Sequence, residues 1–367
     1  MKTSRRASGA ARGVAVGLWL GLGACGGAPT GDWVWSLPDH FPEPVVPEDN
    51  PMSVAKVELG RRLFYDQRLS VDGSYACASC HLPERAFTDG RARAVGVTGE
   101  VHPRGAMAVV NVAWATTLGW ANPTLRTLED QALVPMFGET PIELGLAGRE
   151  AAVFGALGAD LTYQRLFADV YPEAPEVSLG SVVKAIAAFE RSLVSAGAPY
   201  DRWVMGDDAA LSPAAKRGLE LFNSERLECF HCHGGFNFAD AVSGAHGRAV
   251  EAFHQTGLYD VDGEGRYPPE NRGLAEITGR DADDGRFKAP SLRNVAVTAP
   301  YMHDGSIETL DGVLDHYAAG GRAGSARTSL LVFGFTLSTE ERGDLKAFLE
   351  ALTDEDFLTD PTHGPPH

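Results

Sequence analysis

The apolar residues of this chain recur with the spacing of amphipathic helices rather than with the alternation typical of strands. One apolar stripe consists of Val183, Ile186, Ala187, Phe189, Leu193 and Val194. Another consists of Leu345, Phe348, Leu349 and Leu352. The second stripe follows Ser338 and Glu341, which form a predicted capping box. Because Gly and Pro are frequent between such stretches, the pattern predicts a mainly α-helical protein with long loops.

A duplicated pattern runs through the chain. A short predicted helix around residues 60–65 leads to the pentad Cys-Ala-Ser-Cys-His at residues 77–81. A similar helix around residues 218–223 leads to the pentad Cys-Phe-His-Cys-His at residues 229–233. The duplication indicates two helical units of the same kind, each with one cysteine-containing loop.

The two units define the expected domains. Ser53 and Ser212 are the expected N-caps of the two short helices. Roughly 340 residues after an N-terminal leader suit two cores, because single cores rarely grow beyond about 250–300 residues. We therefore predict one domain at residues 52–205, a second at 206–358, and a tail at 359–367.

The N-terminal residues are typical of an export signal. Positive charges, at Lys2, Arg5, Arg6 and Arg12, precede a short apolar run. The run ends in Leu-Gly-Ala-Cys, which resembles a bacterial lipobox with Cys25 as the lipidated residue. We expect a lipoprotein signal peptide at 1–24, a lipid-anchored linker at 25–51, and a periplasmic protein tethered only by its lipid. An ordinary cleavage site with an incidental cysteine is the alternative.

The charge balance narrows the class of partner. The chain carries 49 acidic and 32 basic residues, a formal net charge of −17. Such a surface repels nucleic acid and attracts cationic or dipolar proteins. We therefore expect no nucleic-acid partner.

Each Cys-x-x-Cys-His pentad is a motif for covalent attachment of a c-type haem, in which two thiols bond the porphyrin and the histidine ligates the iron. The first set is Cys77, Cys80 and His81, and the second is Cys229, Cys232 and His233. A zinc half-site or a redox thiol pair is the alternative, but zinc patterns space their ligands differently. The sequence thus predicts two covalently bound c-type haems.

The segments between and after the pentads resemble the bacterial dihaem cytochrome c peroxidase and MauG family. The resemblance covers most of residues 52–355, and its most specific parts are residues 69–73, 86–90, 128–132, 290–295 and 298–305. It implies two cytochrome c-like haem domains in a dihaem peroxidase and MauG architecture. It also implies that the N-terminal haem reacts with hydrogen peroxide and that the C-terminal haem stores or relays electrons.

One position separates the branches of this family. The peroxidases place a methionine fourteen residues after the histidine that corresponds to His303, as axial ligand of the C-terminal haem. This chain has Tyr317 there, as MauG-like proteins do. A phenolate favours high oxidation states of iron, whereas a thioether raises the reduction potential. An ordinary helix-face aromatic residue is the alternative for Tyr317.

A second position concerns the N-terminal haem. Many of the peroxidases carry a distal histidine sixteen residues after the one that corresponds to His81, and Val97 stands there in this chain. We therefore expect a five-coordinate iron. His102 lies close by in sequence and could replace the missing ligand, but we favour a loop histidine that supports the site without ligating iron.

The resemblance also supplies catalytic residues. It assigns a distal glutamine and glutamate to Gln131 and Glu143, although the spacing leaves Glu139 as a competitor. A carboxylate above a haem iron can move a proton between the two oxygens of peroxide. Trp120 matches the tryptophan that carries oxidising equivalents from one haem to the other.

The surroundings of Trp120, at residues 119–123 and 132–138, resemble the MbnH branch of the family. Proteins of that branch pair with a small partner, MbnP, and oxidise one of its tryptophans to kynurenine. Lys288 and Arg293 are expected partners of the haem propionates, with surface solvation as the alternative for Lys288.

The family's calcium site would use the carbonyls of Thr298 and Pro300 and the side chain of an asparagine. The matching asparagine position is Gly105, which offers no side-chain oxygen. Calcium is therefore an open expectation.

The leading hypothesis is an oxidase that uses hydrogen peroxide to modify a periplasmic, MbnP-like protein, through a state in which both haems share the oxidising equivalents. The alternative is a cytochrome c peroxidase supplied with electrons by a small cytochrome. A third class is an electron carrier with both irons capped, which His102 as a ligand would favour.

Overall fold

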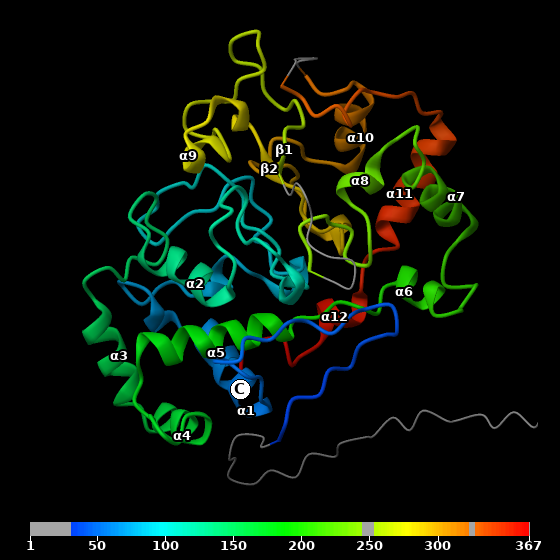
Figure 1. The fold of residues 1–367 in the computed structure, drawn as a ribbon. Helices are drawn as coiled ribbons and strands as arrows, with labels where there is room; N and C mark the ends of the chain where they lie inside the picture. Colours follow the sequence, from blue (N-terminus) through cyan, green and yellow to red (C-terminus); the bar gives the residue numbers. More distant parts are fainter. Residues whose placement is uncertain (1–30, 244–252, 323–326, 367) are drawn as a thin grey trace, which may run out of the picture.

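A computed structural model describes residues 31–243, 253–322 and 327–366 of the chain. The fold is mainly helical, as the apolar pattern predicts, with long loops between short helices (Figure 1). The helices are α1 (Val54–Phe64), α2 (Leu128–Phe137), α3 (Glu150–Gly158), α4 (Leu161–Val170), α5 (Leu179–Ser192), α6 (Pro199–Val204), α7 (Pro213–Phe222), α8 (Cys229–Cys232), α9 (Ala275–Thr278), α10 (Leu310–Ala318), α11 (Thr339–Glu350) and α12 (Glu355–Thr359). Two short antiparallel strands, β1 (Phe253–His254) and β2 (Phe287–Lys288), pair Phe253 with Lys288.

Three predicted helix starts are present. The hydroxyls of Ser53 and Ser212 accept the backbone N–H groups of the third residue inside α1 and α7. Ser338 and Glu341 form the predicted capping box at the start of α11. Each side chain satisfies an N–H group that the first helical turn leaves without a partner.

Two helix crossings repeat the same geometry. Helix α1 packs on α5, and α7 packs on α11. At the first crossing a Cβ atom on Gly60 would lie 1.9 Å from the Ala185 carbonyl oxygen, and at the second a Cβ on Gly218 would lie 2.0 Å from that of Asp344. The two glycines let the backbones approach more closely than any side chain would allow.

Each crossing is the centre of a hydrophobic core. The first core is built around Leu59, Leu63, Phe64, Ile186 and Phe189. The second is built around Phe222, Phe238, Leu345, Phe348 and Leu352. Figure 1 shows α1 to α5 together in one part of the molecule and α7, α10 and α11 in another.

The end of the chain returns to the first core. Phe357 and Leu358 of α12 belong to that core, and the Tyr65 hydroxyl donates to the His363 carbonyl at 2.7 Å. Phe357 and Leu358, at the end of the predicted second domain, thus pack on the core of the first, and the predicted tail continues along it at His363. This returning segment ties the two units together.

The linker range also differs from expectation over its described part. The indole N–H of Trp114 donates to the Pro42 carbonyl at 2.8 Å, and Phe41 and Asn50 are buried. From residue 31 onward the segment packs on the body of the protein rather than acting as a free tether. The predicted signal peptide 1–24 and Cys25 lie outside the described residues.

Within the described ranges, no helix combines the length and apolar character needed to cross a membrane.

Candidate functional site

The first pentad holds its histidine in a defined orientation. His81 Nδ1 donates to the Phe87 carbonyl oxygen at 2.7 Å. That carbonyl is presented by a turn in which Ala86 and Phe87 have φ of 50° and 60°. A hydrogen bond at Nδ1 fixes the tautomer, so the Nε2 lone pair is left for a metal. Burial lowers the pKa of His81, which keeps the imidazole neutral.

The second pentad repeats this arrangement. His233 Nδ1 donates to the Phe238 carbonyl oxygen at 3.2 Å, and Phe238 again has a positive φ, of 48°. Burial lowers the pKa of His233 as well. In both pentads the imidazole is thus neutral, and its Nε2 takes no part in the hydrogen bond that Nδ1 donates.

The four pentad cysteines form no disulfide with one another or with another described residue. Burial raises the pKa of Cys80 to about 11 and that of Cys229 to about 12, so the thiols are neutral. In the part of the chain that the structure describes, the group of three potential metal-binding side chains at the second pentad contains its spacer residue His231, and neither its cysteines nor His233. The attachment cysteines and histidines thus belong to no such group among the described residues, which disfavours the zinc alternative.

A cavity that opens to solvent lies beside the first pentad. Cys77, Cys80 and His81 line it, together with Gln131 of α2 and Glu143 of the following loop. Burial raises the pKa of the Glu143 carboxyl. The structure thus brings the predicted glutamine and glutamate into the same cavity as the first pentad.

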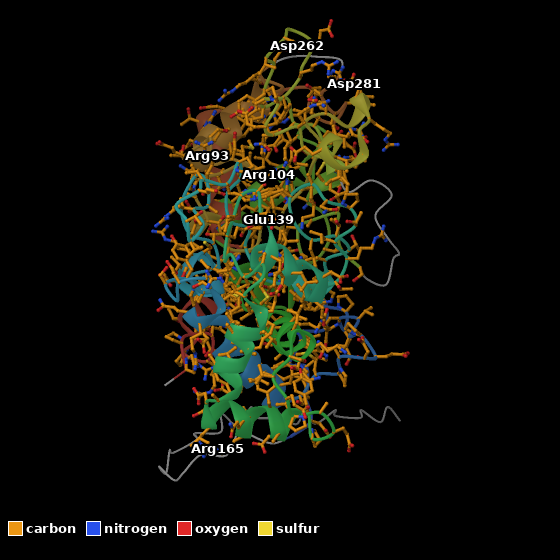
Figure 2. All side chains as sticks on the ribbon, turned by 90° about the vertical axis from the view of Figure 1, so that its left-hand side faces the viewer. Arg93, Arg104, Glu139, Arg165, Asp262 and Asp281 are labelled. Carbon is orange, nitrogen blue, oxygen red and sulfur yellow. The ribbon has the colours of Figure 1, made fainter. Side chains whose placement is uncertain are left out.

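The competing carboxylate lies elsewhere. Glu139 is exposed and does not line the cavity, and Figure 2 shows it on the face toward the viewer. The geometry therefore favours Glu143 over Glu139.

His102 lines the cavity and Val97 does not. The backbone N–H of Val97 donates to the Glu143 carbonyl at 2.8 Å, which holds the Glu143 loop in place. His102 Nε2 lies 4.0 Å from Glu143 Oε1, and its Nδ1 accepts the Arg104 backbone N–H at 3.1 Å.

That hydrogen bond decides what His102 can do. An imidazole that accepts at Nδ1 carries its proton on Nε2 when it is neutral. Burial lowers the pKa of His102 to about 4, so the ring is neutral at pH 7. With a proton on Nε2, His102 can donate into the cavity but cannot ligate iron through that atom. The geometry favours the interpretation of a supporting histidine.

Glu190 is a cavity residue that the sequence pattern did not single out. It lies on α5, lines the cavity, and its Oε2 has no hydrogen-bond partner. Burial raises its pKa to about 8. The available signal was an acidic residue four positions after Ile186, on the apolar face of a helix.

Tyr317 lies on α10, beside the second pentad. Burial raises the pKa of its phenol, and the nearby Cys232 and Cys229 raise it further. Tyr317 is thus close enough to the second pair of cysteines for them to affect its pKa. A buried phenol favours the neutral form, so only a strongly positive centre such as ferric iron would hold it as phenolate.

The two predicted propionate partners differ. Lys288 of β2 is half-buried, donates to the Thr117 carbonyl at 3.1 Å, and has its pKa lowered by burial to about 8. Its ammonium is engaged by the protein, which disfavours the alternative of simple surface solvation. The prediction for Arg293 conflicts with the structure, because its guanidinium pairs with Asp201 at 2.8 and 2.9 Å and donates to the Phe236 carbonyl. This fully buried pair already neutralises the charge that a propionate would need.

Trp120 connects the surroundings of both sites. Its indole N–H donates to the Gly105 carbonyl at 2.8 Å, on the segment that follows His102. On its other side it packs against a cluster that contains Tyr267 and Phe287.

The same bond bears on the calcium expectation. The Gly105 carbonyl is engaged by Trp120, and the hydroxyl of Thr298 donates to the Val295 carbonyl at 3.1 Å. Gly105 offers no side-chain oxygen, and its carbonyl already accepts one hydrogen bond, whereas the carbonyls of Thr298 and Pro300 stay predicted ligands.

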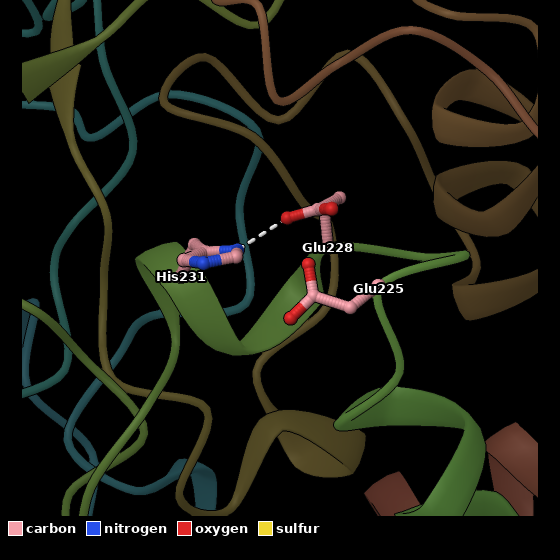
Figure 3. Close-up of side chains that lie close together, drawn as sticks. All are labelled: Glu225, Glu228 and His231. Carbon is pink, nitrogen blue, oxygen red and sulfur yellow. Dashed lines mark ion pairs between the residues drawn. The ribbon is translucent and has the colours of Figure 1, made fainter.

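A separate group lies next to the second pentad. Glu225, Glu228 and His231 place their ligand atoms within 4.8 Å of one another, and His231 forms an ion pair with Glu228 (Figure 3). This pair anchors the spacer residue of the pentad to the residue before Cys229. We assign it no metal.

Comparisons with known proteins agree with this geometry. The family model for di-haem cytochrome c peroxidase matches residues 54–209. The methylamine utilization protein MauG of Methylorubrum extorquens is 36% identical over 320 residues, which are 87% of this chain and 83% of that protein. The cytochrome-c peroxidase IdrP1 of a Pseudomonas species is 34% identical, over 88% of this chain and 87% of that protein.

A solved structure is similar over nearly its whole length. It is the crystal structure of a MauG-like protein associated with microbial copper homeostasis, with a TM-score of 0.88 and 47% sequence identity. The similarity covers 91% of this chain and 99% of that one.

The chain therefore belongs to the dihaem cytochrome c peroxidase family, the family of MauG. It is a haem-dependent oxidoreductase of dihaem peroxidase and MauG architecture, and the family implies two c-type haems. The sequence-based predictions of family, fold and class of enzyme are confirmed. The residues fit these haems, because each pentad offers two free thiols and an imidazole whose Nδ1 is already engaged.

Proposed function

We propose that this protein uses hydrogen peroxide to oxidise a tryptophan of a periplasmic, MbnP-like partner, with kynurenine as the product. In this proposal it is tethered by a lipid on Cys25, with residues 52–205 as the peroxide-reactive unit and residues 206–358 as the electron-transfer unit. Haem, when bound, supplies the redox chemistry.

The observation that carries the proposal is the inequality of the two pentad sites. The cavity beside His81 holds Gln131, Glu143 and His102, and the neutral ring of His102 carries its proton on Nε2. The site beside His233 has Tyr317 where a peroxidase has methionine. One site is built to admit peroxide, and the other to stabilise a high oxidation state.

The residues of the first cavity have separate tasks. Glu143, whose pKa is raised by burial, can take a proton from one peroxide oxygen and return it to the other. Gln131 can hold peroxide by its amide, and the Nε2–H of His102 can donate to it or to Glu143. Trp120 would carry the oxidising equivalent toward the second site, and Lys288 remains the propionate partner.

The named similarity to a cytochrome-c peroxidase favours a second candidate, the reduction of hydrogen peroxide with electrons from a small cytochrome. The two functions differ in what loses electrons. In the first, a partner protein gains oxygen, whereas in the second a reduced cytochrome becomes oxidised and no protein is modified.

The test is peroxide treatment of the holoprotein together with the products of adjacent reading frames, followed by peptide mass spectrometry. We expect a tryptophan of one partner to gain mass, and Tyr317→Met to lose this product. Tyr301→Phe, in the same unit, is the control that keeps it. Rapid oxidation of a reduced cytochrome without any modified partner would establish the second function instead.

A further inference from the structure

A row of aromatic rings leads away from Trp120. The ring centroids of Trp120 and His303 are 6.4 Å apart, and those of His303 and Tyr267 are 6.0 Å apart. Tyr267 is followed by Tyr259 at 5.4 Å. All three distances lie in the range of contacting aromatic pairs, about 4.5–7 Å. The rings therefore form a continuous path.

The outer end of the path is near the protein surface. Tyr259 is half-buried and lies three residues before Asp262, which Figure 2 shows at the extreme end of the fold. Val261, two residues along, is 58% exposed. A donor bound to the loop at residues 259–262 would lie close to the Tyr259 ring.

Tyr259 also has a place for its proton. Its hydroxyl donates to Asp304 Oδ2 at 2.5 Å. A phenol loses an electron much more readily when its proton can move to a nearby base. The carboxylate is available for this, because burial raises the pKa of Asp304 less than the hydrogen bonds from Tyr259 and Ser306 lower it, so that it lies below its usual value.

The imidazole in the inner part of the path is uncharged, and the Arg104 guanidinium is the cation that acts on it. Burial holds the pKa of His303 well below its usual value, so the ring between Trp120 and Tyr267 is neutral. His303 stacks on Phe287 at 3.7 Å, which fixes its position. Tyr267 is also close enough to Tyr317 to influence its pKa, so the path passes the second pentad site.

We propose that Tyr259 is the surface terminus at which oxidising equivalents leave the haem pair, to be taken up by an indole group held against the loop. This inference rests on the proposed function and names its exit point. Tyr259 gives one electron to oxidised Trp120 by way of Tyr267, and its proton moves to Asp304. The indole then returns one electron to Tyr259, the proton returns from Asp304, and the indole releases a proton to solvent. Two such transfers supply the two electrons that hydrogen peroxide takes up with two protons to leave as two waters.

Tyr163 provides a matched comparison within the chain. Its hydroxyl also donates to a carboxylate, Asp66 Oδ2, at 2.8 Å. Its ring belongs to the first core with Phe167, however, and not to the cluster that holds Trp120. Tyr163 thus has a carboxylate partner but lies outside the aromatic path. Comparing it with Tyr259 separates the effect of the proton acceptor from that of the path.

The experiment treats the diferric holoprotein with hydrogen peroxide in the presence of a nitroso radical trap and maps the adducts by peptide mass spectrometry. We expect an adduct on Tyr259 that is lost in Tyr259→Phe and reduced in Tyr267→Phe and Asp304→Asn. Tyr163→Phe should leave it unchanged. In parallel, oxidation of N-acetyltryptophanamide should fall in Tyr259→Phe while the peroxide-induced change in the haem spectrum is retained.

The outcomes separate the two proposals. If the haems react with peroxide and a partner is oxidised, but no adduct forms on Tyr259 and Tyr259→Phe oxidises the amide at the wild-type rate, this inference fails alone. If peroxide does not alter the haem spectrum, both proposals fail together.

Discussion

The same residue-scale device holds both pentad histidines. In each pentad an imidazole Nδ1 donates to the carbonyl of a phenylalanine with positive φ, and the phenylalanine ring fills the adjacent core. The pentads themselves identify these histidines from sequence alone. The hydrogen bonds that orient them could not be predicted, because they depend on backbone turns at residues whose types do not indicate a positive φ.

His102 shows why distal residues are harder to predict than attachment residues. Its role is set by an N–H two residues later and by a loop around Glu143 forty positions away. Glu190 was missed for a related reason, since an acidic residue within an apolar stripe is normally explained as the edge of the stripe. The ion pair of Arg293 could not be predicted from the residues around it, because its partner Asp201 is remote in sequence.

The first prediction concerns His102. We expect His102→Phe to slow the reaction with peroxide by up to about tenfold, which corresponds to the loss of one hydrogen bond worth ~0.5–1.5 kcal/mol. The spin state of the diferric protein should stay unchanged, because His102 does not ligate iron. Stopped-flow absorption and electron paramagnetic resonance measure the two quantities. A low-spin haem that becomes high-spin in the variant would show that His102 is a ligand, and Val97→Ala is the control that alters neither quantity.

The second prediction concerns pH and Glu190. The carboxyl of an unfolded glutamate titrates at about 4.3, whereas burial raises the pKa of Glu190 to about 8 in the folded protein. Between these values the folded state binds the extra proton, so this group's contribution to the free energy of unfolding falls as pH rises. We expect Glu190→Gln to reduce the loss of stability between pH 5 and pH 8 by more than about 1 kcal/mol, since one pKa unit is worth about 1.4 kcal/mol. Urea unfolding at both values tests this, and Glu139→Gln, at an exposed position, should match wild type.

At the scale of elements, the helix crossings give the third prediction. A Cβ on Gly218 would meet the Asp344 carbonyl oxygen in the backbone of α11, which cannot turn away as a side chain could. We expect Gly218→Ala to lower the free energy of unfolding by roughly 1–3 kcal/mol through overpacking. Gly155→Ala in α3, where a Cβ has open space, should instead stabilise by roughly 0.5–1 kcal/mol. Equal effects of the two substitutions on chemical unfolding would contradict the close-approach argument.

The sequence predicts helix starts well where only neighbouring residues determine them. The caps at Ser53, Ser212 and Ser338 form as expected because each involves only the first turn of its helix. The apolar stripe at 183–194 corresponds to α5, which ends at Ser192. Helix α12 was missed, since its five residues are held by contacts of Phe357 and Leu358 with a core from the opposite end of the chain.

At the scale of the whole molecule, the buried pair of Arg293 and Asp201 joins distant segments. Asp201 lies on α6, Arg293 follows β2, and His40 of the N-terminal segment also bonds to Asp201, at 2.9 Å. Arg293 in addition lies over the ring of Phe41, 4.6 Å from its centroid. The N-terminal segment and both units thus meet at one ion pair.

This junction gives the fourth prediction. Asp201→Asn leaves a fully buried guanidinium without its counter-charge, which typically costs roughly 3–5 kcal/mol. We expect a correspondingly lower free energy of unfolding in urea. Asp208→Asn removes an exposed carboxylate that pairs with Lys216 at 3.8 Å and should change stability by less than about 1 kcal/mol. A loss in Asp201→Asn no larger than in Asp208→Asn would show that the junction contributes little.

The central claim is that the two haem sites are unequal, one open beside His81 and one closed by Tyr317 beside His233. Electron paramagnetic resonance of the diferric holoprotein, with optical spectra of the wild type and Tyr317→Met, tests it most directly. We predict one high-spin five-coordinate haem and one haem with histidine and tyrosine ligands, of which only the second changes in the variant. Histidine and methionine ligation in the wild type, or two low-spin haems, would contradict it.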